Sequence, residues 1–125
     1  MLKLVFIIGT GGFIGSVLRF YISKFIQEAF FSNYPYGTFA VNVSGCLLIG
    51  LISGIAEKGT WMAPEWRLFL TVGLCGGFTT FSTFSSESFQ LLRDGQLLHA
   101  LMYTSFSLFT CLAAVFAGYI ITKSI

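Results

Sequence analysis

The sequence predicts an all-α membrane protein with four transmembrane helices, and two observations favour that fold class. Hydrophobic residues make up 55% of the 125 residues and charged residues only 10%, and the mean hydropathy of +0.83 lies far above the range of soluble globular proteins. Four weakly charged apolar runs cover residues 4–21, 37–56, 68–92 and 100–122. Because a helix of roughly 20 residues crosses about 30 Å of hydrocarbon, we expect each run to span the bilayer once.

Other interpretations of these runs fit the sequence less well. The runs are too long and too continuously apolar for the alternating strands of a membrane barrel. The first run follows Lys3, as in a signal peptide, but no small-residue cleavage site comes after it and the rest of the chain is equally apolar. We therefore predict helices at about 4–27, 37–56, 67–92 and 99–122, forming one domain over residues 1–125 in the cell (inner) membrane.

The positive charges are nearly balanced between the two sides of such a protein. With four crossings, one side carries Lys3, Lys58, Arg67 and Lys123, and the other carries Arg19, Lys24 and Arg93. Since the asymmetry of Lys and Arg orients membrane proteins, four charges against three give almost no preference. The sequence therefore suggests dual topology, in which two oppositely inserted copies pair as an antiparallel homodimer.

Polar side chains are arranged along single faces of the second and fourth predicted helices. Thr38 and Asn42 are four residues apart, and the fourth helix repeats the arrangement with Tyr103, Ser107 and Thr110. A hydroxyl group can bond to its own helix, but an unpaired carboxamide in lipid costs roughly 2 to 7 kcal/mol. Asn42 therefore predicts a polar path inside the protein.

The third predicted helix carries both aromatic and hydroxyl-bearing positions. Phe81 and Phe84 fall on one face, whereas Thr80, Thr83 and Glu87 fall on another. Apart from Glu87, these groups are neutral, and hydroxyl and amide donors predominate. Such donors replace water around an anion, and the edge of a phenyl ring carries the positive part of its quadrupole. The path therefore suits a small anion better than a cation.

The remaining residues indicate neither an enzyme nor disulfides or metal ligands among the cysteines. The one histidine, His99, and the one aspartate, Asp94, fall in a predicted loop, so a nucleophile with its base is missing. Cys46, Cys75 and Cys111 lie within apolar runs without metal-ligand spacing, and we interpret them as packing residues. No organic cofactor and no nucleic-acid partner are expected.

Three motifs resemble the Fluc family of fluoride channels, also called CrcB. They are GGFIGSVLRF (residues 11–20), YGTFAVNVSG (36–45) and GLCGGFTTFSTFSSE (73–87), in the order and spacing of that family. The resemblance covers nearly the whole chain, and the third motif is the most specific. Ser16 stands where the family often has Ala or Cys, and the fourth helix is the least diagnostic stretch.

The resemblance implies a passive, highly selective channel that exports cytoplasmic fluoride through two pores of an antiparallel homodimer. Phe81 and Phe84 match the pair that meets the ion, and Asn42 matches the amide beside the pore. The remaining implied positions comprise a hydroxyl-rich break in the third helix, polar residues along the pore, a vestibule arginine and the pore end: Thr79, Thr80, Ser82, Thr83, Thr38, Tyr103, Ser107, Arg19 and Glu87.

The resemblance also implies a structural Na⁺ at the dimer centre, held by the backbone carbonyls of Gly76 and Thr79. Gly76 and Gly77 weaken a helix, and carbonyls released in lipid need partners. The alternative to a channel is a small four-helix, dual-topology multidrug exporter. Such an exporter needs a carboxylate within its first membrane span, and residues 4–21 contain none.

Overall fold

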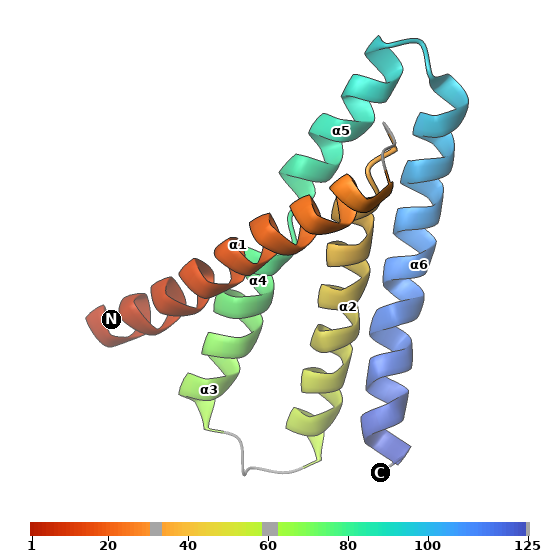
Figure 1. The fold of residues 1–125 in the computed structure, drawn as a ribbon. Coiled ribbons are helices and arrows are strands. Elements are labelled where there is room, and N and C mark those ends of the chain that lie inside the picture. The colour runs from red at the N-terminus through yellow and green to blue at the C-terminus, as the bar shows by residue number, and fades with distance from the viewer. Residues whose placement is uncertain (31–33, 59–62, 125) are drawn as a thin grey trace.

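The computed structural model describes residues 1–30, 34–58 and 63–124 as a set of helices. The helices are α1 (Leu2–Phe30), α2 (Tyr36–Glu57), α3 (Pro64–Leu68), the π-helix η1 (Phe69–Cys75), α4 (Gly76–Phe78), α5 (Phe81–Arg93) and α6 (Leu97–Ser124). The helices α3 to α5 follow one another along a single path, so the chain crosses the molecule four times (Figure 1). Parts of the first two of the three predicted connections, residues 31–33 and 59–62, lie outside the described residues.

Four segments are long and apolar enough to cross a membrane: Leu2–Phe30, Tyr36–Glu57, Pro64–Arg93 and Leu97–Ser124. Each contains the corresponding predicted helix and is longer by one to a few residues at its ends. Large apolar side chains are exposed along these helices, as expected where lipid or another membrane helix is the neighbour. The prediction of an all-α protein with four membrane-spanning helices is confirmed.

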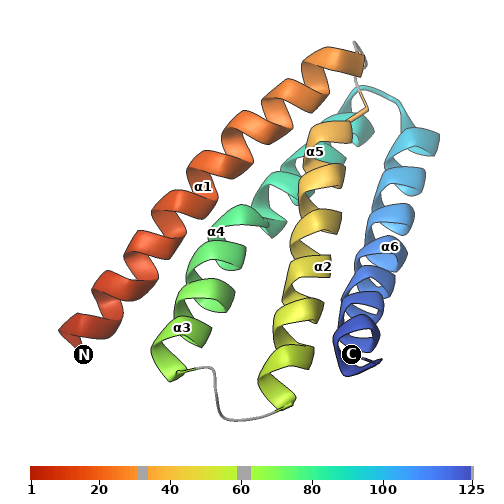
Figure 2. The ribbon, with the colours of Figure 1, turned by 60° about the horizontal axis from the view of Figure 1, so that its bottom comes forward.

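The helices alternate in direction along the chain, so that α2 and α6 are parallel. The N-terminus, the end of α2, the start of α3 and the C-terminus share one end of the molecule (Figures 1 and 2). At the other end, α5 passes to α6 through a tight turn in which Gly95 has a φ of 80°. Only glycine adopts this conformation readily.

The helices α2 and α6 form the most extensive helix pair, which we call the α2–α6 seam. Along it, a residue of α2 faces the residue 65 positions later in α6, as Gly50 faces Val115 and Gly54 faces Tyr119. A Cβ atom at Gly50 would collide with the carbonyl oxygen of Val115. Small residues therefore allow the two backbones to touch in lipid, where close packing stabilises helix pairs.

The helix α1 packs against η1 and α4 through the glycines of the first motif. A Cβ atom at Gly11 would lie 2.8 Å from the Phe69 carbonyl oxygen, and one at Gly77 would lie 2.6 Å from the Gly12 carbonyl oxygen. The π-helical turn of η1 lies on this glycine-rich contact and was not predicted from the sequence. Its glycines are followed by an extended pair, Thr79 and Thr80, between α4 and α5.

Candidate functional site

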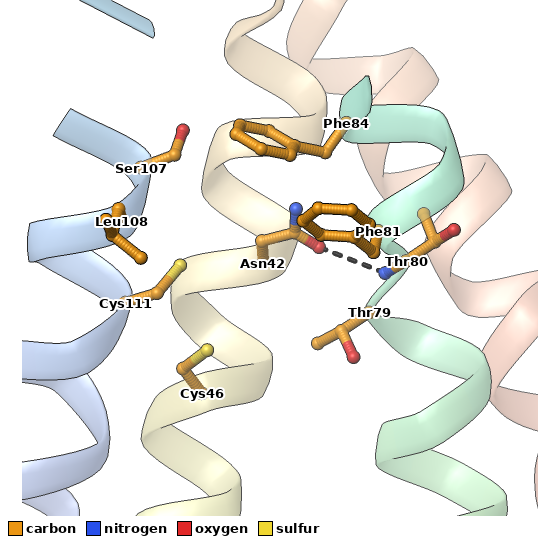
Figure 3. Close-up of a pocket in the computed structure, with 9 residues that line it drawn as sticks. All are labelled: Asn42, Cys46, Thr79, Thr80, Phe81, Phe84, Ser107, Leu108 and Cys111. Atoms are coloured by element: carbon orange, nitrogen blue, oxygen red, sulfur yellow. Dashed lines mark hydrogen bonds between the residues drawn. The ribbon is translucent and has the colours of Figure 1, made fainter. Parts of the chain in front are cut away.

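A cavity of about 240 Å³ lies between α2, α6 and the extended pair, at the middle of the molecule (Figure 3). It is partly open to the outside of the chain. Its lining combines an amide, hydroxyl groups, two phenyl rings and two thiols: Asn42, Cys46, Thr79, Thr80, Phe81, Phe84, Ser107, Leu108 and Cys111. The structure thus brings together five of the predicted pore residues in one place, namely Asn42, Thr80, Phe81, Phe84 and Ser107.

Asn42 is held by the extended backbone of the third span. Its Oδ1 accepts a hydrogen bond from the backbone N–H of Thr80 at 3.2 Å. Thr80 has φ −150° and ψ 130°, so its N–H points away from the preceding helix and toward α2. The NH₂ group of Asn42 lies on the side of Phe84 (Figure 3). An amide oxygen fixed in this way leaves the amide donors directed toward the cavity.

The two phenylalanines form a tilted pair at the wall of the cavity. Their ring centroids are 5.7 Å apart with an angle of 47° between the planes, and Phe84 packs at 5.1 Å against Tyr103. Tyr103 is completely buried, whereas Phe81 is 78% exposed. One end of this aromatic series is therefore anchored in the chain, and the other end faces outward.

The extended pair redirects the backbone donors that would otherwise close the helix. In a continuous helix the N–H groups of Thr80 and Thr83 would bond to the carbonyls of Gly76 and Thr79. Here Thr80 donates to Asn42, and Thr83 donates to the Thr80 hydroxyl at 3.4 Å. The carbonyls of Gly76 and Thr79, the predicted Na⁺ ligands, therefore lack these helical hydrogen bonds. Backbone carbonyls in a membrane require other partners in their place.

The sequence predicts that Gly76 and Gly77 weaken the third helix, but both glycines are helical. The helix is interrupted after them, which corrects this prediction. Gly76 has φ −62° and ψ −37°, while the extended residues are Thr79 and Thr80. β-branched residues adopt extended backbone readily, and Thr80 also caps the new helix. Arg19, the predicted vestibule residue, donates from Nε to the Gly77 carbonyl at 3.2 Å and so supports the end of α4.

A second polar group lies next to the cavity, toward the end of the molecule with the α5–α6 turn. The Thr38 hydroxyl donates to Glu87 Oε1 at 2.5 Å. The Tyr103 hydroxyl lies near both residues without a hydrogen bond to either. Ser82 and Thr83 lie on α5 outside the cavity lining, and the Ser82 hydroxyl contacts that of Thr80 at 3.1 Å.

Two buried hydroxyl groups are left without hydrogen-bond partners among the described residues, those of Tyr103 and Ser107. Ser107 is 5% exposed and lines the cavity, and Tyr103 is the residue one helical turn away on the same face of α6. Since buried hydroxyls in proteins are normally bonded to protein or to ordered solvent, the Ser107 hydroxyl can donate to a guest in the cavity.

Sequence reasoning missed three lining residues, Cys46, Leu108 and Cys111. Cys46 lies four residues after Asn42, and Cys111 lies four residues after Ser107, so both continue the polar faces that had been recognised. Extending the four-residue repeat by one more turn would have found both thiols.

A further hollow of about 390 Å³ lies near the α5–α6 end and is mainly aromatic: Tyr34, Tyr36, Phe39, His99, Met102 and Phe106. Tyr34 packs edge-to-face against His99 and Tyr103, with centroids 6.2 and 5.5 Å apart. Partial burial, and to a smaller extent the neighbouring Tyr36, raises the pKa of the Tyr34 phenol. The aromatic contacts continue from Tyr34 in this hollow through Tyr103 to Phe84.

These features define a small multi-pass membrane protein with four spans and, between them, a cavity lined in part by polar side chains. Residues 6–119 match the family model described as CrcB-like protein, Camphor Resistance (CrcB). The chain belongs to the CrcB family.

Relatives support this assignment over nearly the full length. The chain is 46% identical to a protein of Flavobacterium psychrophilum, covering 99% of this chain and 100% of that one. It is 44% identical to a protein of Azobacteroides pseudotrichonymphae, over 98% of each chain, and 45% identical to one of Chlorobaculum tepidum, over 98% of this chain and 97% of that one. Each of the three relatives is named a fluoride-specific ion channel.

Proposed function

We propose that this protein is a passive fluoride channel, and the observation that carries the proposal is the donor-lined cavity with its phenylalanine pair. Fluoride is small and strongly hydrated, so a path through lipid must replace its water with donors. The Asn42 amide and the Ser107 hydroxyl supply donors, and the edges of Phe81 and Phe84 add positive potential without a fixed cation. The names of the relatives support fluoride as the ion. Conduction requires no bond to be made or broken, so the protein is proposed not to be an enzyme.

The fluoride path would follow the half of the α2–α6 seam that carries Asn42 and Ser107, which we call the polar half. From the cavity at Asn42 and Ser107 it would continue past Thr38 and Tyr103 toward Glu87. The hydroxyls of Ser82, Thr83 and Thr80 would border it on α5, and Arg19 would lie toward the other vestibule. In the cell, such a path would let fluoride leave the cytoplasm down its gradient.

The functional unit would be an antiparallel homodimer with two pores. One chain leaves the cavity open and Phe81 78% exposed, so a second copy is needed to separate the path from lipid. A two-fold axis would give each copy one cavity, and hence two equivalent pores. The near balance of positive charge between the two ends is consistent with insertion in both orientations.

The carbonyls of Gly76 and Thr79 would hold a structural Na⁺ between the two copies. They fit this role because Asn42 and Thr80 take the backbone donors that would otherwise satisfy them. Oxygen ligands suit a hard cation. The cation would supply positive potential beside the pores, while the residues of the chain provide the fluoride contacts.

Flux from liposomes tests the proposed function. Purified protein is reconstituted with potassium fluoride or potassium chloride inside, and efflux is started with a potassium ionophore. We expect rapid fluoride efflux and chloride efflux close to that of protein-free vesicles. Equal rates for the two anions, or no efflux of either, would overturn the proposal.

Topology tests the antiparallel dimer independently of flux. Reporters fused at the C-terminus should give signals on both sides of the membrane, and two lysines added after Lys123 should shift the distribution. A reporter found on one side only in the unmodified chain would contradict dual insertion.

A multidrug exporter, the alternative considered above, is favoured by no feature of the cavity or the family.

A further inference from the structure

Two thiols face each other at the middle of the α2–α6 seam. Cys46 and Cys111 follow the same spacing of 65 residues as Asn42 and Ser107 one turn away on one side and Gly50 and Val115 one turn away on the other. Both thiols line the central cavity. In Figure 3 the sulfur of Cys111 points from α6 toward α2, and the sulfur of Cys46 lies in front of α2 below it.

The chemistry of this pair restricts what it can bind. Both cysteines are free thiols, and the third, Cys75, is completely buried and outside the cavity lining. Among the described residues no group of three or more His, Cys, Asp or Glu side chains converges. Two thiols are therefore too few for zinc, which takes four ligands in structural sites and three protein ligands in catalytic ones. Soft monovalent ions such as Cu⁺ and Ag⁺ prefer sulfur and accept two ligands.

We propose that Cys46 and Cys111 form a binding site for a soft monovalent cation of the copper(I) and silver(I) class inside the central cavity. Binding replaces two S–H bonds with two sulfur–metal bonds and releases both protons to solvent, with no change of oxidation state. The bound unit of one cation and two thiolates carries a single negative charge. It therefore obstructs an anion by its volume and by repulsion, one helical turn from Asn42. The obstruction rests on the proposed fluoride path, whereas the binding does not.

Competition with a monothiol tests the binding. The detergent-purified protein is loaded with silver nitrate, passed through a desalting column in excess glutathione, and analysed for silver per chain. Because the second sulfur binds intramolecularly at a high effective concentration, we expect about one silver ion to remain on the wild type. The variants Cys46→Ser and Cys111→Ser should each lose it, since one sulfur competes poorly with glutathione. The matched control Cys75→Ala should keep it.

Retention by either serine variant, loss from the wild type, or loss from Cys75→Ala would overturn the two-thiol site. Fluoride efflux provides a separate measurement. Silver should slow efflux through the wild type at least about tenfold, and the serine variants should be unaffected. If silver binds and efflux is unchanged, the metal site stands and the assignment of the cavity to the fluoride path is overturned. If the untreated protein gives no efflux, the channel proposal fails while the binding result is unaffected.

Discussion

The two halves of the α2–α6 seam use the same spacing for opposite purposes. In one half, Gly50 and Gly54 bring the backbones so close that no Cβ atom fits against Val115 or Tyr119. In the other half, Asn42 and Thr38 lie level with Ser107 and Tyr103, and a cavity opens beside them. The glycine half contributes packing, and the polar half contributes donors.

This difference explains how a chain with four spans can hold polar groups in lipid. Removing side chains in one half allows α2 and α6 to pack tightly, and this stabilises the pair without a polar contact. The same pair can then carry an amide and unpaired hydroxyls a few turns away. If the glycine half fixes the geometry, substitutions there should affect folding, and substitutions in the polar half should mainly affect transport.

The largest effect on folding is expected from Gly50→Ala. The added methyl group meets the backbone carbonyl of Val115, which cannot move aside as a side chain could. We expect the free energy of unfolding to fall by about 3 kcal/mol, measured by denaturant unfolding in micelles. Gly9→Ala is the matched control, because nothing lies within 4 Å of its Cβ position, and it should be neutral or slightly stabilising. Similar stability of the two variants would show that the glycine half does not determine the packing.

A smaller loss of stability, with a clear loss of transport, is expected from Asn42→Leu. Leucine fills a similar volume but leaves the Thr80 N–H without its acceptor, at a cost of about 1 to 3 kcal/mol. Fluoride efflux should fall at least about tenfold, because an amide donor is lost as well. Ser44→Ala is the control, since among the described residues the Ser44 hydroxyl donates to the Ala40 carbonyl of its own helix, at 2.7 Å. Efflux at the wild-type rate in Asn42→Leu would exclude Asn42 from the path.

The smallest effects on stability are expected from substitutions of Thr38 and Thr122, two buried threonines at opposite ends of the seam. Thr38 donates to Glu87 on another helix, whereas Thr122 donates to Gly118 and Tyr119 of its own helix. Hydrogen bonds between membrane helices contribute about 1 kcal/mol. Thr38→Val should therefore lower the free energy of unfolding by about that amount, and Thr122→Val by less than about 0.5 kcal/mol. The reverse order would contradict the division between the two halves.

The four spans and the polar faces could be predicted because each depends on a regular spacing in the sequence. Apolar runs of the length of a bilayer give the spans, and the four-residue repeat gives the pairing of Asn42 with Ser107 on neighbouring helices. The repeat also contains Cys46 and Cys111, but their place in apolar runs without metal-ligand spacing favours an interpretation as packing residues. That interpretation does not include the cavity that both thiols line.

Features that depend on contacts between distant segments could not be predicted. The π-helical turn Phe69–Cys75 has no sequence signature and lies where α1 approaches through its glycines. The first helix is predicted to end near residue 27, whereas α1 continues to Phe30. Gln27, near this end, donates to the Tyr34 carbonyl at 2.9 Å and accepts from the Gly37 N–H at 3.1 Å, and these contacts between distant residues were not predicted. Gln27 thus links the end of α1 to the start of α2.

Replacement of both cavity phenylalanines tests the central claim most directly, namely that the cavity in the polar half conducts fluoride. Phe81→Ile with Phe84→Ile keeps most of the apolar volume but removes both ring edges. Loss of two aromatic contacts worth about 1 kcal/mol each should slow fluoride efflux from liposomes roughly 30-fold, with the oligomeric state unchanged by size-exclusion chromatography. The control carries Phe109→Ile and Phe116→Ile on the exposed side of α6 and should conduct normally. Wild-type fluoride efflux in the folded Phe81 and Phe84 double variant would contradict the account.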